Sequence, residues 1–448
     1  MKNGISILLI NPWITDFAAY NLWAEPLGLY YIASILREAG ARVNYINCLV
    51  SSHNKNPRPK ENGCSKYIRR VIEKPDCLLS IPRHFAIYGM GDEEFILKLR
   101  SAELPDAVLI TSLMTYWYPG AFRVIKLVRS VLGWGIPIIL GGIYTKLCKA
   151  HAYRRAKADF IYTEDDPFSL LVLIERISGK EFGKYPCLHS FAEYPLPMHE
   201  LHKGMNFFAL LTRRGCPYRC SYCASPILCS EFTGRIKSNV ISEIVKYTKY
   251  LATKNIAFYD DALLVGPEHH IVPILEEISE SFRGLSFYLP NGVHASLITP
   301  RIAQLFSLAG IKTVRIGLET ANENLQDKMG KKTTNIEYVK AVHYLREAGY
   351  QRKDLGTYIM AGLPGQTADD VDASIDFVYR AGGSPYLSYF SPIPGTKIWK
   401  EATRTSPFPI EREPLFQNNT VYILGITHFS EGSLRYLKDK TVELRKAL

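Results

Sequence analysis

The chain is long, mixed in character and basic. Its 448 residues are 47% hydrophobic and 12% aromatic, which excludes a disordered or low-complexity protein and exceeds what one ordinary core holds, so two domains are expected. Lysine and arginine number 54 against 43 acidic residues, a formal net charge of +11. The basic residues are spread along the chain, which favours a solvated basic surface and makes nucleic acid an unlikely partner.

The first strand, 5–10, is too short an apolar run for a membrane span or a secretory signal. Nine cysteines, an odd number with six of them scattered singly, are typical of reduced thiols. We therefore expect a soluble, untargeted cytoplasmic protein.

Residues 1–180 alternate between short apolar strands and amphipathic helices. In chain order we expect strand 5–10, helix 28–40, strand 42–50, strand 107–114, helix 120–132, strand 136–140 and strand 159–163. This α/β alternation predicts an N-terminal Rossmann-like, doubly wound sheet. A polar, proline-rich insert at 51–98, with a helix expected near 66–73, interrupts it and is predicted to cap a crevice or form an interface.

The ligand crevice of such a sheet lies beyond the carboxyl ends of its strands. That rule gathers residues 11–16, 111–118 and 141–144 at one edge. The pair Gly141–Gly142 either lets the backbone approach a ligand closely or forms an ordinary strand-to-helix turn.

Residues 181–206 are expected to be an interdomain linker, and a second alternation follows over 207–395. It comprises strand 207–212, helix 240–252, strand 256–260, helix 270–282, strand 287–290, helix 300–308, strand 313–318, helix 336–348, strand 356–361, helix 368–380 and strand 386–390. Six strands predict a partial (β/α)6 TIM-like barrel with reactive loops at the carboxyl ends of its strands. Residues 396–448 are expected to be a tail with a helix from 431.

The loop after the first of these strands carries Cys216, Cys220 and Cys223. A C-x3-C-x2-C spacing offers three thiolates and no fourth, which suits a 4Fe-4S cluster with one iron open for chemistry. A zinc knuckle is the alternative, but neither Cys229 nor His202 completes the paired spacing that structural zinc needs.

Polar and glycine residues follow the other strands of this half. They are Asp260 and Asp261 after the second strand, Asn291 to His294 after the third, Gly317 to Thr320 after the fourth, and Gly362 to Thr367 after the fifth. Because the carboxyl ends of parallel strands meet at one edge, these residues are expected to share one mouth with the thiolates.

The cysteine spacing, with an aromatic Tyr222 before the last cysteine, resembles the signature of the radical S-adenosylmethionine (SAM) superfamily over about residues 205–395. The resemblance implies that Cys216, Cys220 and Cys223 hold a 4Fe-4S cluster whose open iron binds SAM. An electron, from a donor such as flavodoxin or ferredoxin, then cleaves SAM to a 5′-deoxyadenosyl radical.

The same resemblance implies roles for five other residues. Tyr222 places backbone near the adenine, Asp260 or Asp261 meets the SAM amino group, Glu319 holds the ribose hydroxyls and Gly365 lies at the adenine edge. The alternatives are structural: the aspartates cap a loop, Glu319 pairs with Arg315 or Lys312, and the glycines serve a turn.

The N-terminal half is similar to the B12-binding domain of the cobalamin-dependent radical SAM subgroup, on Asn11–Pro12 and the segment 26–40. This similarity implies bound cobalamin, with Trp13 and Tyr116–Trp117–Tyr118 either lining the corrin or packing between domains. The Asp-x-His-x-x-Gly motif that supplies an axial imidazole in many cobalamin proteins is absent. A Rossmann domain that has lost cobalamin and only shields the site is therefore the alternative.

The function that the resemblance implies is cobalamin-dependent methylation of an unactivated carbon in a small-molecule or peptide substrate. Radical cyclisation or rearrangement, methylthiotransferase-like RNA modification and a non-enzymatic iron–sulfur carrier are the alternatives. No catalytic residue that handles the substrate radical is assigned.

Overall fold

The computed structural model describes residues 4–53, 57–202, 205–426 and 428–446. It divides into two compact units. Unit 1 is Met1–Asn206 with Arg412–Leu415, and unit 2 is Phe207–Glu411 with Phe416–Leu448. Each unit is built on a parallel sheet with helices, as the α/β alternation of the sequence predicts.

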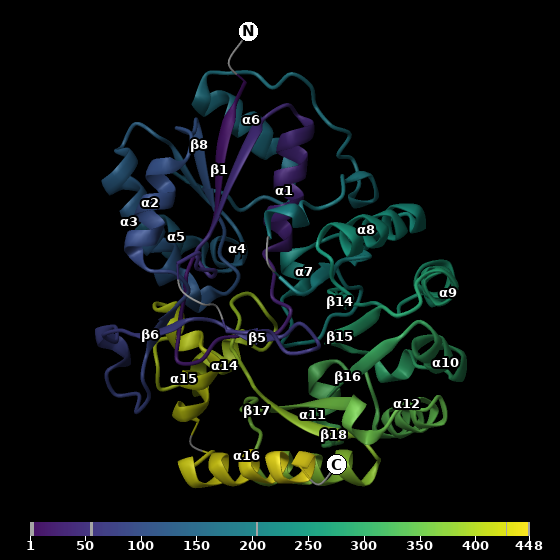
Figure 1. Ribbon diagram of the computed structural model, residues 1–448. Helices are drawn as coiled ribbons and strands as arrows, with labels where there is room; N and C mark the ends of the chain where they lie inside the picture. The colour runs from purple at the N-terminus through teal and green to yellow at the C-terminus, as the bar shows by residue number, and fades with distance from the viewer. Residues whose placement is uncertain (1–3, 54–56, 203–204, 427, 447–448) are drawn as a thin grey trace. The chain divides into compact units, whose positions relative to one another are not determined.

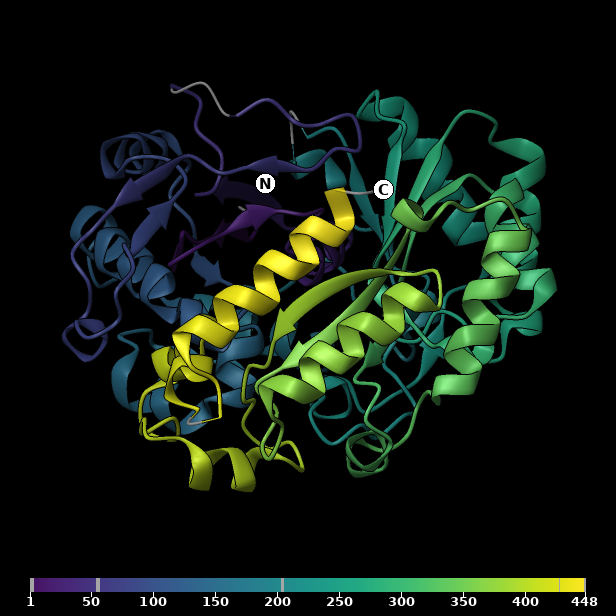
Figure 2. The ribbon, with the colours of Figure 1, turned by 90° about the horizontal axis from the view of Figure 1, so that it is seen from below.

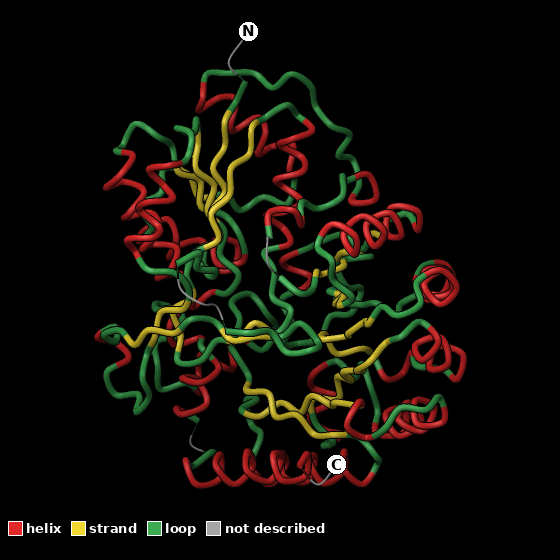
Figure 3. Tube along the Cα trace, in the orientation of Figure 1, coloured by secondary structure: helices red, strands yellow, loops and turns green. Residues whose placement is uncertain are grey.

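The sheet of unit 1 has five parallel strands (Figure 3). Their order is β10 (Phe160–Ile161), β9 (Ile138–Leu140), β8 (Ala107–Ile110), β1 (Ser6–Asn11) and β4 (Arg42–Asn47). Every residue of β1 and β8 is buried, because helices cover both faces of the sheet and a continuous apolar run is the sequence that such a strand needs. Helices α1 (Leu27–Glu38) and α6 (Pro167–Ser178) lie on one side, and α2 (Asp92–Ser101) and α3 (Tyr118–Leu132) on the other (Figure 1).

The insert of unit 1 forms short antiparallel strands, so the helix expected near 66–73 is wrong. β5 (Ser65–Lys66) pairs with β3 (Tyr20–Asn21), and β7 (Ala86–Tyr88) pairs with both β6 (Arg69–Val71) and β2 (Ile14–Asp16). Each partner strand is distant in the sequence. The backbone hydrogen bonds of these ladders therefore outweigh a weak local preference for helix.

The sheet of unit 2 has six parallel strands in chain order. They are β11 (Phe208–Leu210), β14 (Asn255–Phe258), β15 (Ser286–Val293), β16 (Ile311–Glu319), β17 (Leu355–Ala361) and β18 (Ser384–Tyr389). Between them run α8 (Lys237–Tyr250), α9 (Ile271–Ser281), α10 (Pro300–Leu308), α12 (Asn335–Glu347) and α13 (Ala368–Arg380). Helices α12 and α13 each begin at a capping box, so local residues determine where they start. The boxes are Thr334 with Glu337 and Thr367 with Asp370.

The helices that connect the strands of unit 2 pack on one face of its sheet. In Figure 1 helices α8, α9, α10 and α12 lie along the same side of the strands. On β17 the residues that face the helices, including Thr357 and Ile359, are buried, whereas the alternate residues Tyr358 and Met360 are partly exposed. We call the other side of the sheet the Glu319 face, after the buried side chain that it carries at the end of β16.

The C-terminal residues fold onto unit 2 apart from Arg412–Leu415. They form α14 (Trp399–Thr405), α15 (Asn419–Tyr422) and α16 (Glu431–Lys446). Figure 2 shows α16 running beside β18. Lys440 fixes this helix through ion pairs of 2.7 Å to Asp372 and 2.8 Å to Asp376 on α13.

Within the ranges that the structure describes, no helix has the length and apolar character needed to cross a membrane.

Candidate active site

The three cysteines lie on one loop of unit 2, between β12 (Arg213–Arg214) and α7 (Ser225–Leu228). All three thiols are half-buried. Burial, together with the nearby charges of Cys223 and Cys220, raises the pKa of the Cys216 thiol to about 11. These mutual effects show that the thiols are close enough to feel one another, so a shared metal centre would relieve the repulsion between their thiolates.

A glycine makes this loop possible. Gly215 has a φ of +84°, and a Cβ there would lie 2.0 Å from the carbonyl oxygen of Glu231. Cys229, the nearest additional cysteine, donates from its Sγ to the same carbonyl at 3.2 Å. The loop therefore offers three cysteines and no fourth.

The chemistry of this donor set fits a 4Fe-4S cluster with one open iron. Among the described residues, no three His, Cys, Asp or Glu side chains converge on a point where a single metal ion is held. A cubane binds each cysteine at a different iron, so it does not require the sulfur atoms to meet around one ion.

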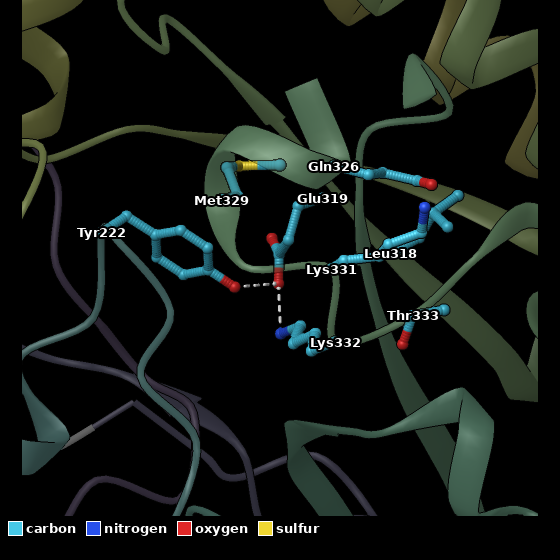
Figure 4. A pocket seen from close by; sticks show the side chains of 8 residues that line it. All are labelled: Tyr222, Leu318, Glu319, Gln326, Met329, Lys331, Lys332 and Thr333. Atoms are coloured by element: carbon cyan, nitrogen blue, oxygen red, sulfur yellow. Dashed lines mark hydrogen bonds and ion pairs between the residues drawn. The ribbon is translucent and has the colours of Figure 1, made fainter. Parts of the chain in front are cut away.

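Glu319 is the centre of a second cluster of polar side chains (Figure 4). Its Oε1 accepts a hydrogen bond of 3.1 Å from the Tyr222 hydroxyl and lies 2.9 Å from Nζ of Lys332. The side chains of Glu319 and Lys332 are only 11% and 15% exposed, and together with Tyr222, Leu318, Gln326, Met329, Lys331 and Thr333 they line a cavity of about 10 Å³.

Electrostatics keep Lys332 charged in this cluster. Burial alone lowers the pKa of Lys332, but the neighbouring Glu319 and Tyr222 raise it well above its ordinary value, so the ammonium stays charged. Burial and the Glu319 charge raise the pKa of Tyr222, so its hydroxyl keeps its proton and donates a hydrogen bond to the carboxylate.

The backbone of β16 is shaped to present Glu319. This residue has a φ of +68°, in the left-handed region that side chains other than glycine rarely adopt. A Cβ at Gly317 would lie 2.9 Å from Nζ of Lys332 and 3.1 Å from Oε1 of Glu319. A glycine two residues before Glu319 therefore leaves room for the ion pair.

The two predicted aspartates occupy different environments. Asp260 is buried and accepts hydrogen bonds from the Thr212 backbone N at 3.2 Å and from Thr212 Oγ1 at 2.6 Å. Burial raises its pKa to about 6, although the Thr212 bonds act against this rise. Asp261 is exposed, and its carboxylate accepts a 2.8 Å bond from Ser225 Oγ, two residues after Cys223.

Gly365 lies in a turn that is held by hydrogen bonds to a buried side chain. Its φ is +82°, and buried Gln366 accepts from the backbone N of Gly362 at 2.9 Å and of Leu363 at 3.2 Å. Across the mouth, the His294 ring stacks on Tyr218 of the cysteine loop at 4.4 Å. Within the described ranges, Tyr222 and Glu319 are in direct contact, whereas Asp260 and Gly365 touch neither of them.

Sequence reasoning missed Lys332. In the sequence it belongs to a basic run, Lys328 to Lys332, that is typical of a solvated surface. The available signal was its place after the short helix α11 (Glu323–Met329), where Gly330, with a φ of +101°, ends the helix and turns the chain back.

In unit 1, the carboxyl edge of the sheet includes an exposed backbone at Gly142, with a φ of +95°. The prediction that Trp13 lines a corrin face is wrong, because Trp13 is 1% exposed, packs on Phe95 at 4.9 Å and donates to the Met90 carbonyl at 2.9 Å. The nearby His151 is buried, with its Nδ1 2.7 Å from the Tyr144 hydroxyl.

Comparison with known proteins agrees with this site. The family model of the radical SAM superfamily matches residues 210–378, which contain the cysteine loop and the Glu319 cluster. The cytidylyl-2-hydroxyethylphosphonate methyltransferase of Streptomyces wedmorensis is 21% identical over 89% of this chain and 82% of its own length. An uncharacterized methyltransferase of Pyrococcus horikoshii is 24% identical over 66% of this chain and 69% of its own.

Solved structures share the fold of both units. The radical SAM methyltransferase TsrM from Kitasatospora setae superposes with a TM-score of 0.68 at 15% identity, covering 98% of this chain and 88% of its own. The cobalamin-dependent radical SAM enzyme OxsB gives a TM-score of 0.63 at 15% identity, covering 94% of this chain and 56% of its own. Three cysteines at the expected spacing lie within residues 210–378, the part of the chain that matches the family model of the radical SAM superfamily.

Proposed function

We propose that the protein cleaves SAM to a 5′-deoxyadenosyl radical and uses it in the cobalamin-dependent methylation of an unactivated carbon. The observation that supports this most is the presence, in one matched domain, of a three-thiol loop and a buried carboxylate held ready by Tyr222 and Lys332. Cys216, Cys220 and Cys223 would hold a 4Fe-4S cluster, which would supply the electron for the reductive cleavage of SAM to methionine and the adenosyl radical.

Glu319 is suited to hold the ribose of SAM. Both of its protein contacts are made by Oε1, and no donor among the described residues engages Oε2. A carboxylate oxygen has room to accept two hydrogen bonds. We therefore assign Oε2 to the ribose hydroxyls, with Tyr222 and Lys332 fixing the carboxylate from the other side.

The remaining SAM contacts fall on residues at the same edge. Asp261, rather than the buried Asp260, is the carboxylate placed to meet the SAM amino group, because it is exposed and tied to Ser225 beside the cysteine loop. The turn at Gly365 serves the adenine edge, where its fixed backbone supplies hydrogen-bonding groups without a side chain in the way.

We assign cobalamin to unit 1, read as a Rossmann-like domain ahead of a partial (β/α)6 barrel. The strand orders support this reading, as do solved structures of related fold described with bound cobalamin. The exposed Gly142 backbone suits a large ligand that lies close to the strand ends. Because the His151 ring is bonded to Tyr144, we expect His151 to serve packing in unit 1 rather than to hold the corrinoid.

The share of this chain that each relative covers favours methyl transfer over methylthiolation. The ribosomal protein methylthiotransferase RimO of Carboxydothermus hydrogenoformans aligns over 38% of this chain. The phosphonate methyltransferase aligns over 89%. The alignment with the phosphonate methyltransferase must therefore include part of unit 1, whereas the alignment with RimO is short enough to fit within unit 2.

Anaerobic reconstitution tests the proposal. Protein loaded with iron, sulfide and hydroxocobalamin, given SAM and reduced flavodoxin or ferredoxin, should release 5′-deoxyadenosine and methionine in equal amounts and retain corrinoid through gel filtration. A fully loaded cluster that leaves SAM intact under every reductant would refute radical formation. Retention of SAM cleavage without corrinoid binding would instead refute cobalamin-dependent methyl transfer and favour cyclisation or rearrangement.

A further inference from the structure

The Glu319 face carries two arginines that the SAM site does not use. Arg315 lies on β16 four residues before Glu319, with the side-chain-free Gly317 between them. It pairs with Gly356 of β17, and a Cβ at Gly356 would lie 1.8 Å from Nη1 of Arg315. The guanidinium therefore lies flat across β17, in space that only a glycine leaves open.

Arg315 ends on Tyr386 of β18, and a second arginine reaches the same ring. The Cζ atom of Arg315 lies 4.1 Å from the ring centroid, and Cζ of Arg445 on α16 lies 4.6 Å from it. Arg445 is also fixed by a 2.7 Å bond from its Nη1 to the Pro385 carbonyl. Burial and the Arg315 charge both lower the pKa of Arg445, because two positive groups share one small space.

Neither arginine is matched by an acid. Among the described residues no carboxylate lies within ion-pair distance of Arg315 or Arg445, and Nη1 of Arg315 is buried without a hydrogen-bond acceptor. Two other cations of unit 2 with buried side chains are paired with acids, Arg235 with Glu243 at 2.6 Å and Lys332 with Glu319 at 2.9 Å. Two like charges and an unsatisfied buried donor are unfavourable unless something else supplies the negative charge.

Side chains beside the two arginines on this part of the Glu319 face are partly exposed. Tyr358, Tyr386 and Ser388 on β17 and β18 are partly exposed, whereas their neighbours Thr357 and Ile359 on the helix-covered side are buried. Four residues of strand separate Arg315 from Glu319, a span of about 13 Å. A small molecule that contacts both ends is therefore long enough to place a carbon beside the SAM site.

We propose that Arg315 and Arg445, held on Tyr386, bind an anionic group of the substrate, a carboxylate or a phosphoryl group. This inference rests on the proposed function, since it names the class of substrate that the radical acts on. Planar guanidiniums recognise both anions through paired hydrogen bonds, and the cation–π contacts with Tyr386 hold them in place beforehand.

The test uses reconstituted protein and two small probes, methylphosphonate and acetate, titrated by calorimetry in low-salt buffer. At least one probe should bind at a single saturable site. Arg315→Gln and Arg445→Gln should each weaken that binding tenfold or more, and Arg315→Lys should weaken it less. The matched control is Arg352→Gln, because Arg352 stacks on Tyr379 with a similar separation of 4.2 Å at a different place, and it should bind like the wild type.

Three outcomes decide the proposal. Failure of the wild type to bind either probe, or unchanged binding in both glutamine variants, overturns it. Equal loss in Arg352→Gln also overturns it, because the effect would then be one of surface charge. If a glutamine variant does not fold by circular dichroism, the lysine variants Arg315→Lys and Arg445→Lys take its place and should show a measurable loss.

The proposed function is judged separately in the same preparations. Absence of 5′-deoxyadenosine from the wild type counts against radical chemistry, whatever the calorimetry shows. Production of 5′-deoxyadenosine with no anion site leaves the radical chemistry intact and removes only this inference.

Discussion

Two features of Glu319 are unfavourable for the free energy of folding: its left-handed backbone conformation and the burial of its charge. A strained non-glycine residue costs about 1–3 kcal/mol and persists only where its surroundings fix it. Here Lys332 and Tyr222 do so, because each donates to the same carboxylate oxygen. The geometry of the ribose site therefore depends on two residues that need not touch SAM.

Replacement of Lys332 tests this dependence. Lys332→Met leaves the buried Glu319 carboxylate with Tyr222 as its donor, so we expect a loss of about 3 kcal/mol in the free energy of unfolding and at least a tenfold loss of 5′-deoxyadenosine formation. Urea unfolding and product assays measure the two effects. Lys237→Met is the matched control, since the side chain of Lys237 is 48% exposed and pairs with Glu277 on the surface.

A double variant separates stability from function. Lys332→Met with Glu319→Gln removes both buried charges, so we expect stability to recover most of the loss while SAM cleavage stays low. Recovery of cleavage in the double variant would contradict the assignment of Glu319 to the ribose.

The cluster cysteines give a prediction of their own. Cys216→Ala, Cys220→Ala and Cys223→Ala each remove one of three thiolates, so iron content should fall from about four atoms per chain to near zero, with loss of SAM cleavage. Iron analysis and absorption near 400 nm measure this. Cys48→Ala should change neither, because Cys48 is fully buried in unit 1; loss of iron there would mean that the ligand set is wrong.

Single residues were predictable where chemistry is local. The cysteine spacing and Tyr222 lie within eight residues, so sequence alone indicates the cluster. Lys332 was not predictable in this way, because its partner Glu319 is thirteen residues away and only the turn at Gly330 brings them together. The unequal roles of Asp260 and Asp261 depend likewise on Thr212 and Ser225, which no pattern connects to them.

At the scale of elements, the start of α4 (Ile143–Leu147) depends on close packing at Gly142. A Cβ there would lie 2.5 Å from the carbonyl oxygen and 2.6 Å from the backbone N of Ser112, which follows β8. The backbone N of Ile143 also donates to that carbonyl at 2.8 Å. The turn therefore locks β9 to the end of β8 at the edge proposed for cobalamin.

Gly142→Ala should destabilise unit 1 by about 2–3 kcal/mol, because left-handed strain adds to overlap with fixed backbone. Gly133→Ala is the control: its φ is +77°, but nothing lies within 4 Å of the added Cβ, so about 1 kcal/mol of strain is expected alone. Urea unfolding measures both. Equal losses would mean that conformational strain, and not contact with Ser112, controls this turn.

Elements were predictable where the periodic pattern is strong. Continuous apolar runs predicted β1 and β8, and the alternation of strands and amphipathic helices predicted α12 and α13, which begin in the structure at capping boxes. The strands of the insert have no such pattern and arise from pairing with distant partners. The expected linker also contains buried side chains that the sequence does not indicate. His199 and His202 are buried, and their Nδ1 atoms lie 3.3 Å and 2.8 Å from the buried carboxylate of Glu25.

For the whole molecule, the pH dependence of the free energy of unfolding depends partly on His270, whose ring is neutral in the folded protein at pH values where it is charged in the unfolded chain. His270 is buried beside Thr212, and burial together with the Arg213 charge lowers its pKa to about 4. In the unfolded chain an imidazole binds a proton below about pH 6.5. Between those values the unfolded chain holds more protons than the folded one, so stability falls as the pH falls.

From pH 6.5 to pH 5 this single group should remove about 1–2 kcal/mol of stability. His270→Gln, which does not titrate, should flatten the dependence by that amount in urea unfolding of the wild type and variant. His343→Gln should not, since the side chain of His343 is 62% exposed. If the free energies of unfolding of His270→Gln and the wild type change in parallel with pH, folding does not lower the pKa of the His270 ring.

The small segment Arg412–Leu415 has a consequence for how the chain is made. It belongs to unit 1, where the Glu413 carboxylate accepts from the Tyr118 hydroxyl at 2.9 Å and from the Leu415 backbone N at 3.0 Å. A ribosome must synthesise Phe207–Glu411 before that segment emerges, a delay on the order of ten seconds or more at ordinary translation rates. The nascent first unit therefore waits, with Tyr118 lacking its carboxylate acceptor, until nearly all of the second has been translated.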